Sequence, residues 1–297
     1  MSTIPLRYNN FWQDRGTGVD YTIDLKSCSR QPGSYLDEIC ANAELIRSMT
    51  NDPIHIMYSG GIDSEFMFHC FMKLGINVRP VFIRLSPEYN NYDYHFVTEL
   101  NKSRKIQIKI IDINFDDFVN SGRFAEIASK LSCHVHQYPA LFDTALRLDG
   151  VVLIGDYEPH FALHNGIWMF DEYESQSVLN RFYQVYGVHG TPAFLNYTPE
   201  TLLSFMNEEV IVDLVEGKFP TSIMGSNKVK PRIYHKYFNL QERVKKDGYE
   251  KIRQSKIYNH PDIQNFKKFR TSYSLPGNGV YTLNHIATRE ILEKDIK

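Results

Sequence analysis

Hydrophobic and polar positions follow two patterns in the first half of the chain. Short apolar runs predict buried strands, and longer segments with an apolar residue every three or four positions predict helices with one buried face. The predicted strands are Ile54–Tyr58, Val78–Leu85, Ile106–Ile113 and the run Gly150–Asp156, which ends in a glycine turn. The predicted helices are Tyr35–Met49, the segment from Asp63 to Gly75, Tyr92–Ser103, a helical stretch within Phe115–Leu131, and Tyr138–Leu148.

Strands and helices therefore alternate along this half, with connections of helix length. That order predicts an α/β fold with a doubly wound, mainly parallel sheet covered by helices on both faces. The pattern becomes less regular after residue 160, with a hairpin signal at Asn165-Gly166. The further predictions are a mixed segment Ser175–Tyr186, helices Pro199–Met206 and Glu208–Val215, a basic loop Thr221–Arg232, a partly helical Ile233–Tyr249, a loop within Thr271–Leu283 and a helix Ile286–Asp295.

We expect three parts in the chain. Residues 1–50 form an N-terminal extension and helix, with Ser34 as the helix cap, Glu38 near the capping-box position, and a strand or hairpin around Val19–Leu25. Residues 51–160 form the α/β domain, and residues 161–297 form a mostly helical substrate lobe that packs on it.

The stretch Ile54–Ile76 carries the strongest functional signal. Its strand ends in Ser59-Gly60-Gly61, then Asp63 and Ser64 follow, and a helical pattern begins. Glycines allow close approach of the backbone to a ligand, and the helix start offers unpaired N–H groups, so the turn suits a phosphate. It lacks the lysine of a Walker A loop and the third glycine of the dinucleotide fingerprint. The alternative is an ordinary glycine turn with a capping Asp or Ser.

The six residues Ser59–Ser64 resemble the SGGxDS motif of the PP-loop ATP pyrophosphatases, the adenine nucleotide alpha hydrolase-like proteins of the HUP fold. This family includes the synthetase domains of asparagine, GMP and NAD synthetases and several tRNA-thiolating enzymes. The resemblance implies that ATP is split between its α and β phosphates, with Mg²⁺ and release of pyrophosphate. Within the family, the chain most resembles the C-terminal synthetase domain of asparagine synthetase.

The resemblance and the predicted sheet together indicate which residues surround the nucleotide. Ligands of an open α/β sheet lie beyond the carboxyl ends of its strands. We expect Asp63 to hold Mg²⁺, and Asp156 and Glu158 in the turn after the fourth strand to hold a metal or substrate, or else to be solvated. The candidates for ATP binding are Tyr58, Ser59, Gly60, Gly61, Ile62, Asp63, Ser64, Arg84 and Gly155.

Basic residues near position 230 are the remaining catalytic candidates beside Asp63. Amide-forming members of the family use a lysine C-terminal to the nucleotide fold, which Lys228, Lys230 or Arg232 would match by position. A solvated basic loop is the commoner explanation of such a run. We interpret the acidic run Asp171–Glu174 as exposed surface.

Composition narrows the function classes. The 297 residues carry a net charge of −2, which gives no general attraction to nucleic acid or to an anionic membrane. No apolar run reaches membrane-span length and no N-terminal signal region is visible, so we expect a cytoplasmic protein. The four cysteines are far apart and spell neither a zinc site nor a disulfide framework; they are Cys28, Cys40, Cys70 and Cys133.

Three functions remain open. The first is an AMP-forming ligase that adenylates a small-molecule or nucleotide substrate and passes it to nitrogen. Because the segment ahead of the loop is too short for a glutaminase domain, the nitrogen would come from ammonia, an amine or a separate subunit. The second is sulfur transfer to a nucleobase or tRNA by Cys133, disfavoured because a partner cysteine is missing. The third is a non-catalytic nucleotide-binding subunit; a homo-oligomer is left open.

Overall fold

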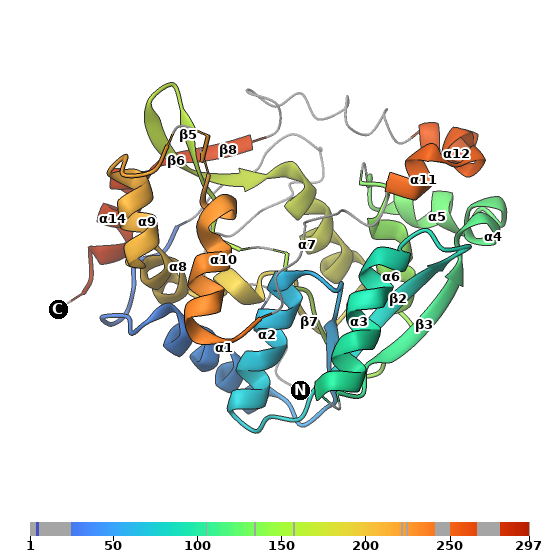
Figure 1. Cartoon of the computed structure of the whole chain (residues 1–297), viewed down its shortest axis with the longest axis horizontal. Coiled ribbons are helices and arrows are strands. Elements are labelled where there is room, and N and C mark those ends of the chain that lie inside the picture. The colour runs from blue at the N-terminus through green and yellow to red at the C-terminus, as the bar shows by residue number, and fades with distance from the viewer. Residues whose placement is uncertain are drawn as a thin grey trace.

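The computed structural model describes residues 4–5, 25–104, 106–133, 135–156, 158–220, 222–223, 225–240, 250–265 and 280–296. Figure 1 shows the arrangement of the elements. In chain order they are α1 (Tyr35–Met49), β1 (Ile54–Met57), α2 (Ile62–Lys73), β2 (Arg79–Ser86), α3 (Asn91–Arg104), β3 (Lys109–Asn114), α4 (Phe115–Asn120), α5 (Arg123–Lys130), α6 (Tyr138–Ala145), β4 (Val151–Leu153), β5 (Phe161–His164), β6 (Ile167–Tyr173), α7 (Glu174–Tyr186), β7 (Gly190–Thr191), the 3₁₀ turn Phe194–Asn196, α8 (Pro199–Met206), α9 (Glu209–Val215), α10 (Ser226–Tyr237), α11 (Glu250–Gln254), the 3₁₀ turn Lys256–Asn259, α12 (Pro261–Gln264), β8 (Val280–Asn284) and α14 (His285–Glu293).

The main sheet has five strands in the order β3-β2-β1-β4-β7, and every pair in it is parallel. The first four are the strands predicted from the apolar runs. The fifth, β7, comes from the part after residue 160 and was not predicted, because two residues give no hydrophobic pattern. The chain is thus an α/β protein with a doubly wound parallel sheet, as expected.

Successive side chains of the central strands point to two separate cores, as the period of two in a strand requires. On β1 and β4, Ile54, Ile56, Val151 and Leu153 belong to one core. Met57 of β1 and Val152 of β4 belong to the other. Helices α1, α2, α3 and α8 cover the first face, while α4, α5, α6 and α7 cover the second (Figure 1).

The start of α1 follows the predicted capping pattern with one correction. The Ser34 side chain accepts from the Asp37 N–H at 3.2 Å, and the Asp37 carboxylate accepts from the Ser34 N–H, so Asp37 and not Glu38 completes the box. Glu38 is buried instead, and its carboxylate binds Arg30 and the Gly33 N–H.

The edge of the sheet beside β4 is closed by β7 at a close approach of backbones. Gly190 pairs with Val152 and has φ +137°. A Cβ atom added at Gly190 would lie 1.8 Å from the Val152 carbonyl oxygen. Only a glycine therefore lets this strand pair form as it does.

The region after residue 160 contains a second, three-stranded antiparallel sheet, β5-β6-β8. The predicted hairpin is confirmed, with the turn at Asn165-Gly166 between β5 and β6. Helices pack beside this sheet at the left of Figure 1, in agreement with the predicted mostly helical lobe. The boundary near residue 160 stays a prediction.

Two predictions for this region need correction. Ser175–Tyr186 is helical, as part of α7, and not mixed. The loop predicted over Thr221–Arg232 contains the first half of the helix α10. The loop signal at 276–279 lies outside the described residues, and the end of the segment Thr271–Leu283 forms part of β8.

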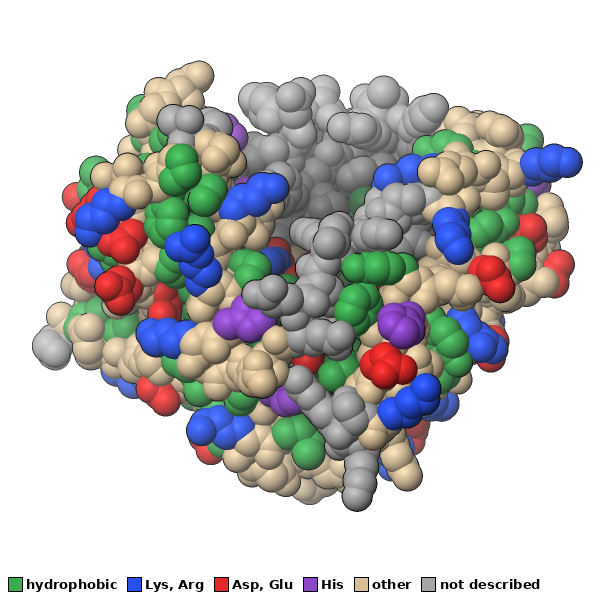
Figure 2. Space-filling view, viewed as in Figure 1, with side chains coloured by type: hydrophobic (Ala, Val, Ile, Leu, Met, Phe, Trp, Pro, Cys, Tyr) green, Lys and Arg blue, Asp and Glu red, His purple; other side chains and the backbone are tan. Residues whose placement is uncertain are grey.

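Some predictions fall where the structure gives no description. The suggested strand Val19–Leu25 lies almost wholly outside the described residues, as do residues 241–249 and 266–279 and the side chains of Asp171–Glu174. Among the described helices, none combines the length and apolar character that crossing a membrane requires. The face seen in Figure 2 intersperses basic and acidic side chains over the described residues.

Candidate active site

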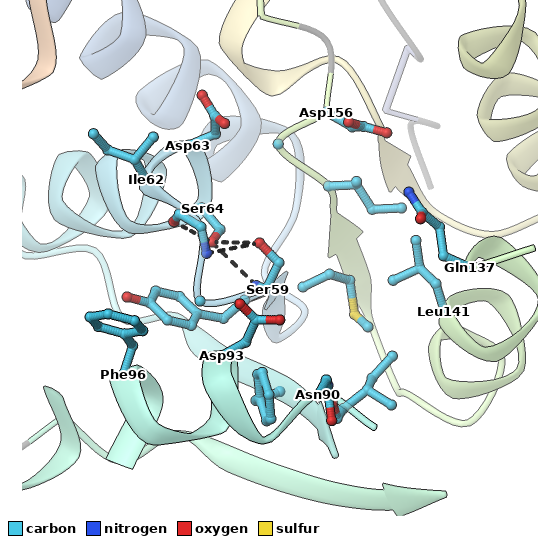
Figure 3. A pocket seen from close by; sticks show the side chains of 18 of the residues that line it. Ser59, Ile62, Asp63, Ser64, Asn90, Asp93, Phe96, Gln137, Leu141 and Asp156 are labelled. Carbon is cyan, nitrogen blue, oxygen red and sulfur yellow. Dashed lines mark hydrogen bonds between the residues drawn. The ribbon is translucent and has the colours of Figure 1, made fainter. Parts of the chain in front are cut away.

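The loop Ser59–Ser64 connects β1 to α2 and is held by hydrogen bonds within itself. The Ser59 N–H donates to the Ser64 hydroxyl oxygen at 3.2 Å, and the Gly61 N–H donates to the Ser59 hydroxyl oxygen at 3.1 Å. The Ser64 hydroxyl donates to the Gly61 carbonyl at 3.0 Å. Gly60 has φ +78°, which glycine adopts without strain. Figure 3 shows this network at the wall of a cavity.

The loop lies where the strand order of the sheet reverses. β1 continues to β2 and β3 on one side, and β4 lies on its other side, so the loop after β1 and the turn after β4 flank the same crevice. A cavity of about 1100 Å³ opens there. Its lining comes from the loop, β2, α3, α6, the end of β4 and α10: Met57–Ser64, Val81–Ile83, Leu85, Asn90, Tyr92, Asp93, Phe96, Gln137, Tyr138, Leu141, Ile154–Asp156, Glu158, Asn227, Lys230–Arg232 and His235.

Asp63 is the meeting point of the loop and α10. Lys230 Nζ lies 2.8 Å from Asp63 Oδ1 and 2.9 Å from Oδ2. The same Nζ donates to Glu158 Oε1 at 2.5 Å. The Tyr234 hydroxyl donates to Asp63 Oδ1 at 3.0 Å. Residues far apart in the sequence thus form one charged cluster in the cavity wall.

Helix α10 brings Lys230 and Tyr234 to this cluster because its apolar face packs on α2. Val229 and Ile233 are buried in the core. The Tyr234 ring stacks on Phe66 of α2 at 4.2 Å between centroids, with an interplanar angle of 7°. Lys230 and Tyr234, four residues apart, share one face of the helix. Polar and basic residues such as Lys228 and Arg232, which predicted a loop, therefore lie on the solvent-exposed side of a helix.

Charge and burial fix the protonation of both α10 side chains. Burial lowers the pKa of Lys230, but the carboxylates of Asp63 and Glu158 outweigh it and hold the pKa above its usual value. The ammonium therefore stays charged. Burial raises the pKa of Tyr234 well above the usual range, and the charge of Asp63 adds to the shift. Its hydroxyl is therefore a neutral donor to Asp63.

Asp156 lies across the cavity from the loop, near Gln137 and Leu141 (Figure 3). Its Oδ2 accepts from the Tyr138 hydroxyl at 2.6 Å. Asp156 is solvent-accessible and lines the cavity. The protein groups packed around it desolvate the carboxylate in part, and this desolvation, followed by the negative charge of Glu158, raises the pKa of Asp156 to about 6.

The carboxylates of the site do not form a ready-made metal cage. Within the described ranges, no group of three His, Cys, Asp or Glu side chains is arranged to hold a metal ion. Mg²⁺, however, commonly binds through one or two carboxylates together with substrate phosphates. Asp63 and Glu158, which share one ammonium, fit that mode, in which the ion is bound together with the nucleotide.

Most of the residues predicted from the sequence meet at this cavity. The whole loop Tyr58–Ser64 lines it, together with Gly155, Asp156, Glu158 and the two α10 residues Lys230 and Arg232. Arg232 is exposed, and its guanidinium lies 5.0 Å from the centroid of the Phe219 ring.

Two predicted residues lie outside the cavity lining. Arg84 pairs with Asp112 of β3 and lies over the Tyr94 ring, 5.0 Å from its centroid. Lys228 is exposed on α10.

Sequence reasoning predicted Tyr58 but missed the other aromatic residues of the site. Tyr234 and Tyr138 each hold a carboxylate through their hydroxyl groups. Tyr234 follows Lys230 by four residues, and that spacing was the available signal. Tyr92 and Phe96 of α3 line the cavity one helical turn apart, again at four-residue spacing.

Cys133 lies in the second core and is fully buried. Burial raises the pKa of its thiol to about 12, which keeps it protonated and unreactive. Cys133 is not among the residues that line the cavity. His134 beside it lies outside the described residues.

No protein-family model and no curated protein sequence matches this chain. Solved structures with a similar arrangement include a predicted subunit of tRNA methyltransferase from Methanocaldococcus jannaschii, with TM-score 0.37 and 14% identity over 78% of this chain and 96% of that chain. An NH₃-dependent NAD synthetase from Campylobacter jejuni has a TM-score of 0.34 and 16% identity, over 79% of this chain and 90% of that chain. An NMN synthetase from Francisella tularensis has a TM-score of 0.32 and 15% identity, over 72% of this chain and 97% of that chain. At such low scores and identities, neither substrate nor reaction is inferred from them.

Proposed function

We propose that the protein is an ATP-dependent, AMP-forming enzyme of the PP-loop type. One observation carries this proposal: Asp63 of the Ser59–Ser64 loop meets Lys230 and Tyr234 in a cavity at the carboxyl edge of the parallel sheet. An anion-binding turn, a carboxylate for a metal and a charged lysine beside it are the groups that phosphate chemistry needs.

The reaction has two steps in this proposal. An oxygen of the acceptor substrate attacks the α-phosphorus of ATP, the bond to the β-phosphate oxygen breaks, and pyrophosphate leaves. A nitrogen nucleophile then attacks the activated carbon of the adenylated acceptor, loses a proton, and releases AMP with the former acceptor oxygen. Ser59, Gly60, Gly61 and Ser64 bind the pyrophosphate part, and Lys230 compensates the charge that develops at phosphorus.

Asp63 and Glu158 would hold Mg²⁺ together with the phosphates, and the ion would neutralise phosphate charge there. Asp156 is a further metal or substrate contact on the opposite wall. Arg232 is exposed and lines the cavity, where it is available to an anionic group, whereas Lys228 is exposed outside the cavity lining. Lys230 is the best supported of the three because it is buried among the carboxylates.

We infer a nitrogen nucleophile, as in an asparagine synthetase-like ligase, because the chemistry of Cys133 does not suit sulfur transfer. Its thiol is buried and protonated, and it lies outside the cavity lining. Ammonia, an amine substrate or a separate donor subunit would supply the nitrogen. Full activity of a Cys133→Ser variant would exclude the sulfur-transfer alternative.

The test is the product of ATP turnover. The protein is incubated with α-labelled ATP, Mg²⁺, ammonium and pools of candidate carboxylic acids, and AMP and pyrophosphate are measured. We expect equal amounts of both, with a rate that falls at least about a hundredfold in Asp63→Asn. The matched control is Asp213→Asn, which also removes a carboxylate from a lysine, at 2.6 Å from Lys218, and lies away from the cavity.

Two outcomes would contradict the proposal. ADP as the product would indicate transfer of the γ-phosphate instead. ATP binding without turnover in every pool, with Asp63→Asn changing affinity alone, would support a non-catalytic nucleotide-binding subunit.

A further inference from the structure

We propose that Lys230 occupies the cation position between Asp63 and Glu158 in the nucleotide-free protein, so that a divalent cation enters only with a phosphate-bearing ligand that draws the ammonium away. The inference rests on the proposed function for the identity of that ligand. In this second role, Lys230 prevents metal ions from binding to the carboxylates of Asp63 and Glu158 until the nucleotide binds.

The contacts of Nζ are those of a bound cation. It lies within 2.9 Å of both oxygens of Asp63 and 2.5 Å from Glu158 Oε1. Only 3% of Lys230 is exposed, whereas the side chains of Asp63 and Glu158 remain 23% and 18% exposed. The two carboxylates are therefore accessible from the cavity while their shared position is filled from the protein side.

Charge makes the two cations alternatives. Two carboxylates and one ammonium carry −1, and a divalent ion placed beside a retained ammonium would meet strong repulsion at these short distances. If the ammonium moves away, the pair offers −2 to a divalent ion. Phosphate groups at the Ser59–Ser64 loop provide the new partner for the lysine, because Lys230 and the loop line the same cavity.

The surroundings allow the lysine to move while Asp63 stays in place. The lysine head is carried on a flexible four-carbon chain. Asp63 keeps its hydrogen bond from the Tyr234 hydroxyl, and the Tyr234 ring is fixed by its stack on Phe66. Exchange of the cation therefore requires rotation of one side chain and no shift of α10.

Binding of Mn²⁺ alone, without nucleotide, tests this inference by electron paramagnetic resonance. The wild type is expected to bind it weakly, and Lys230→Gln to bind it about tenfold tighter or more, because the uncompensated carboxylates are then open. The same variant should have a lower Tm without metal, since it leaves buried charge unpaired, and should regain stability on addition of Mn²⁺.

Two controls isolate the site. Lys236→Gln, on the same helix, removes a lysine 2.9 Å from the buried Glu208 and should gain no affinity for Mn²⁺. The double variant Asp63→Asn, Lys230→Gln should lose the gained affinity. Equal binding of Mn²⁺ by the wild type and Lys230→Gln, or a gain that persists in the double variant, would overturn the inference.

A measurement on the wild type covers the case in which Lys230→Gln does not fold. Lysine labelled with ¹⁵N should give a protected ammonium signal for Lys230 that Mg²⁺ alone leaves unchanged and Mg²⁺ with inorganic pyrophosphate shifts. A shift with Mg²⁺ alone would overturn the inference. These readouts do not depend on turnover, so AMP formation together with a failed exchange would reject this inference and leave the proposed function intact.

Discussion

The two walls of the cavity are built in opposite ways. The loop wall, Ser59–Ser64, is held by hydrogen bonds between residues no more than five positions apart. The helix wall, formed by α10 and the end of β4, is held by bonds from Lys230 and Tyr234 that span 72, 167 and 171 positions. One wall is set by local backbone conformation, and the other by charge and packing between distant segments.

This difference predicts different responses to mutation. Changes in the loop wall should act through backbone shape and affect every ligand of the loop. Changes in the helix wall should act through single polar contacts, with smaller and more selective effects.

Of the variants that compare the two walls here, Gly60→Ala should give the largest effect. A Cβ there would meet the Asp93 carbonyl oxygen at 3.2 Å, and the φ of +78° costs an alanine about 1–2 kcal/mol. We expect the displaced loop to lower the rate of AMP formation on the order of a hundredfold, measured with saturating ATP.

Gly75→Ala is the matched control for this prediction. Gly75 has a similar φ of +66°, but no atom lies within 4 Å of an added Cβ. It should lose the same stability in thermal unfolding and keep its activity. If both variants lose activity alike, the strain and not the loop position would be responsible.

Tyr234→Phe should give an intermediate effect. It removes the hydroxyl from Asp63 but keeps the ring on Phe66. Because a hydrogen bond to a charged group contributes about 1.5–3 kcal/mol, we expect at least about tenfold weaker binding of a non-hydrolysable ATP analogue with Mg²⁺, measured by calorimetry.

Tyr183→Phe is its control, since this buried hydroxyl donates to the Val152 carbonyl at 2.9 Å and Tyr183 lies outside the cavity lining. Both variants should lose similar stability, and only Tyr234→Phe should lose affinity. Unchanged affinity in Tyr234→Phe would mean that the helix wall does not orient Asp63.

Asp156 should give the smallest effect, visible as a pH dependence of stability. Its pKa of about 6 in the folded protein exceeds the usual 3.8, so the folded state holds this proton more tightly than the unfolded state. The free energy of unfolding therefore falls as pH rises from about 4 to about 6. We expect Asp156→Asn to be more stable than the wild type at pH 7.

The difference in free energy of unfolding between Asp156→Asn and the wild type should shrink as the pH falls toward 4. Urea unfolding without ligands measures it. A constant difference across this range would contradict the raised pKa of Asp156. Glu126→Gln, which replaces an exposed carboxylate on α5, serves as the control.

Much of the fold can be predicted from the sequence because buried apolar residues recur at regular spacings in strands and helices. The strands β1 to β4 and the helices between them bury enough consecutive or periodic apolar residues to be predicted. The strand β7 has two residues, and its pairing with β4 depends on a close backbone approach that no side-chain pattern encodes.

The loop wall was predictable and the helix wall was not, for the same physical reason. Ser59, Gly60 and Ser64 act through contacts that their spacing already defines. Lys230 was a candidate among several basic residues, and nothing local tells it apart from Lys228. Its distinction is burial beside Asp63 and Glu158, which only the folded chain supplies.

Gly190 is a position at which we expect the fold to tolerate no other residue. Any side chain there would collide with the Val152 carbonyl and separate β7 from β4, next to the strand end that carries Asp156. Gly166 and Gly217 have open space around them and should accept replacements such as asparagine. In a library of functional variants, position 190 should therefore be as invariant as Gly60, although Gly190 does not line the cavity.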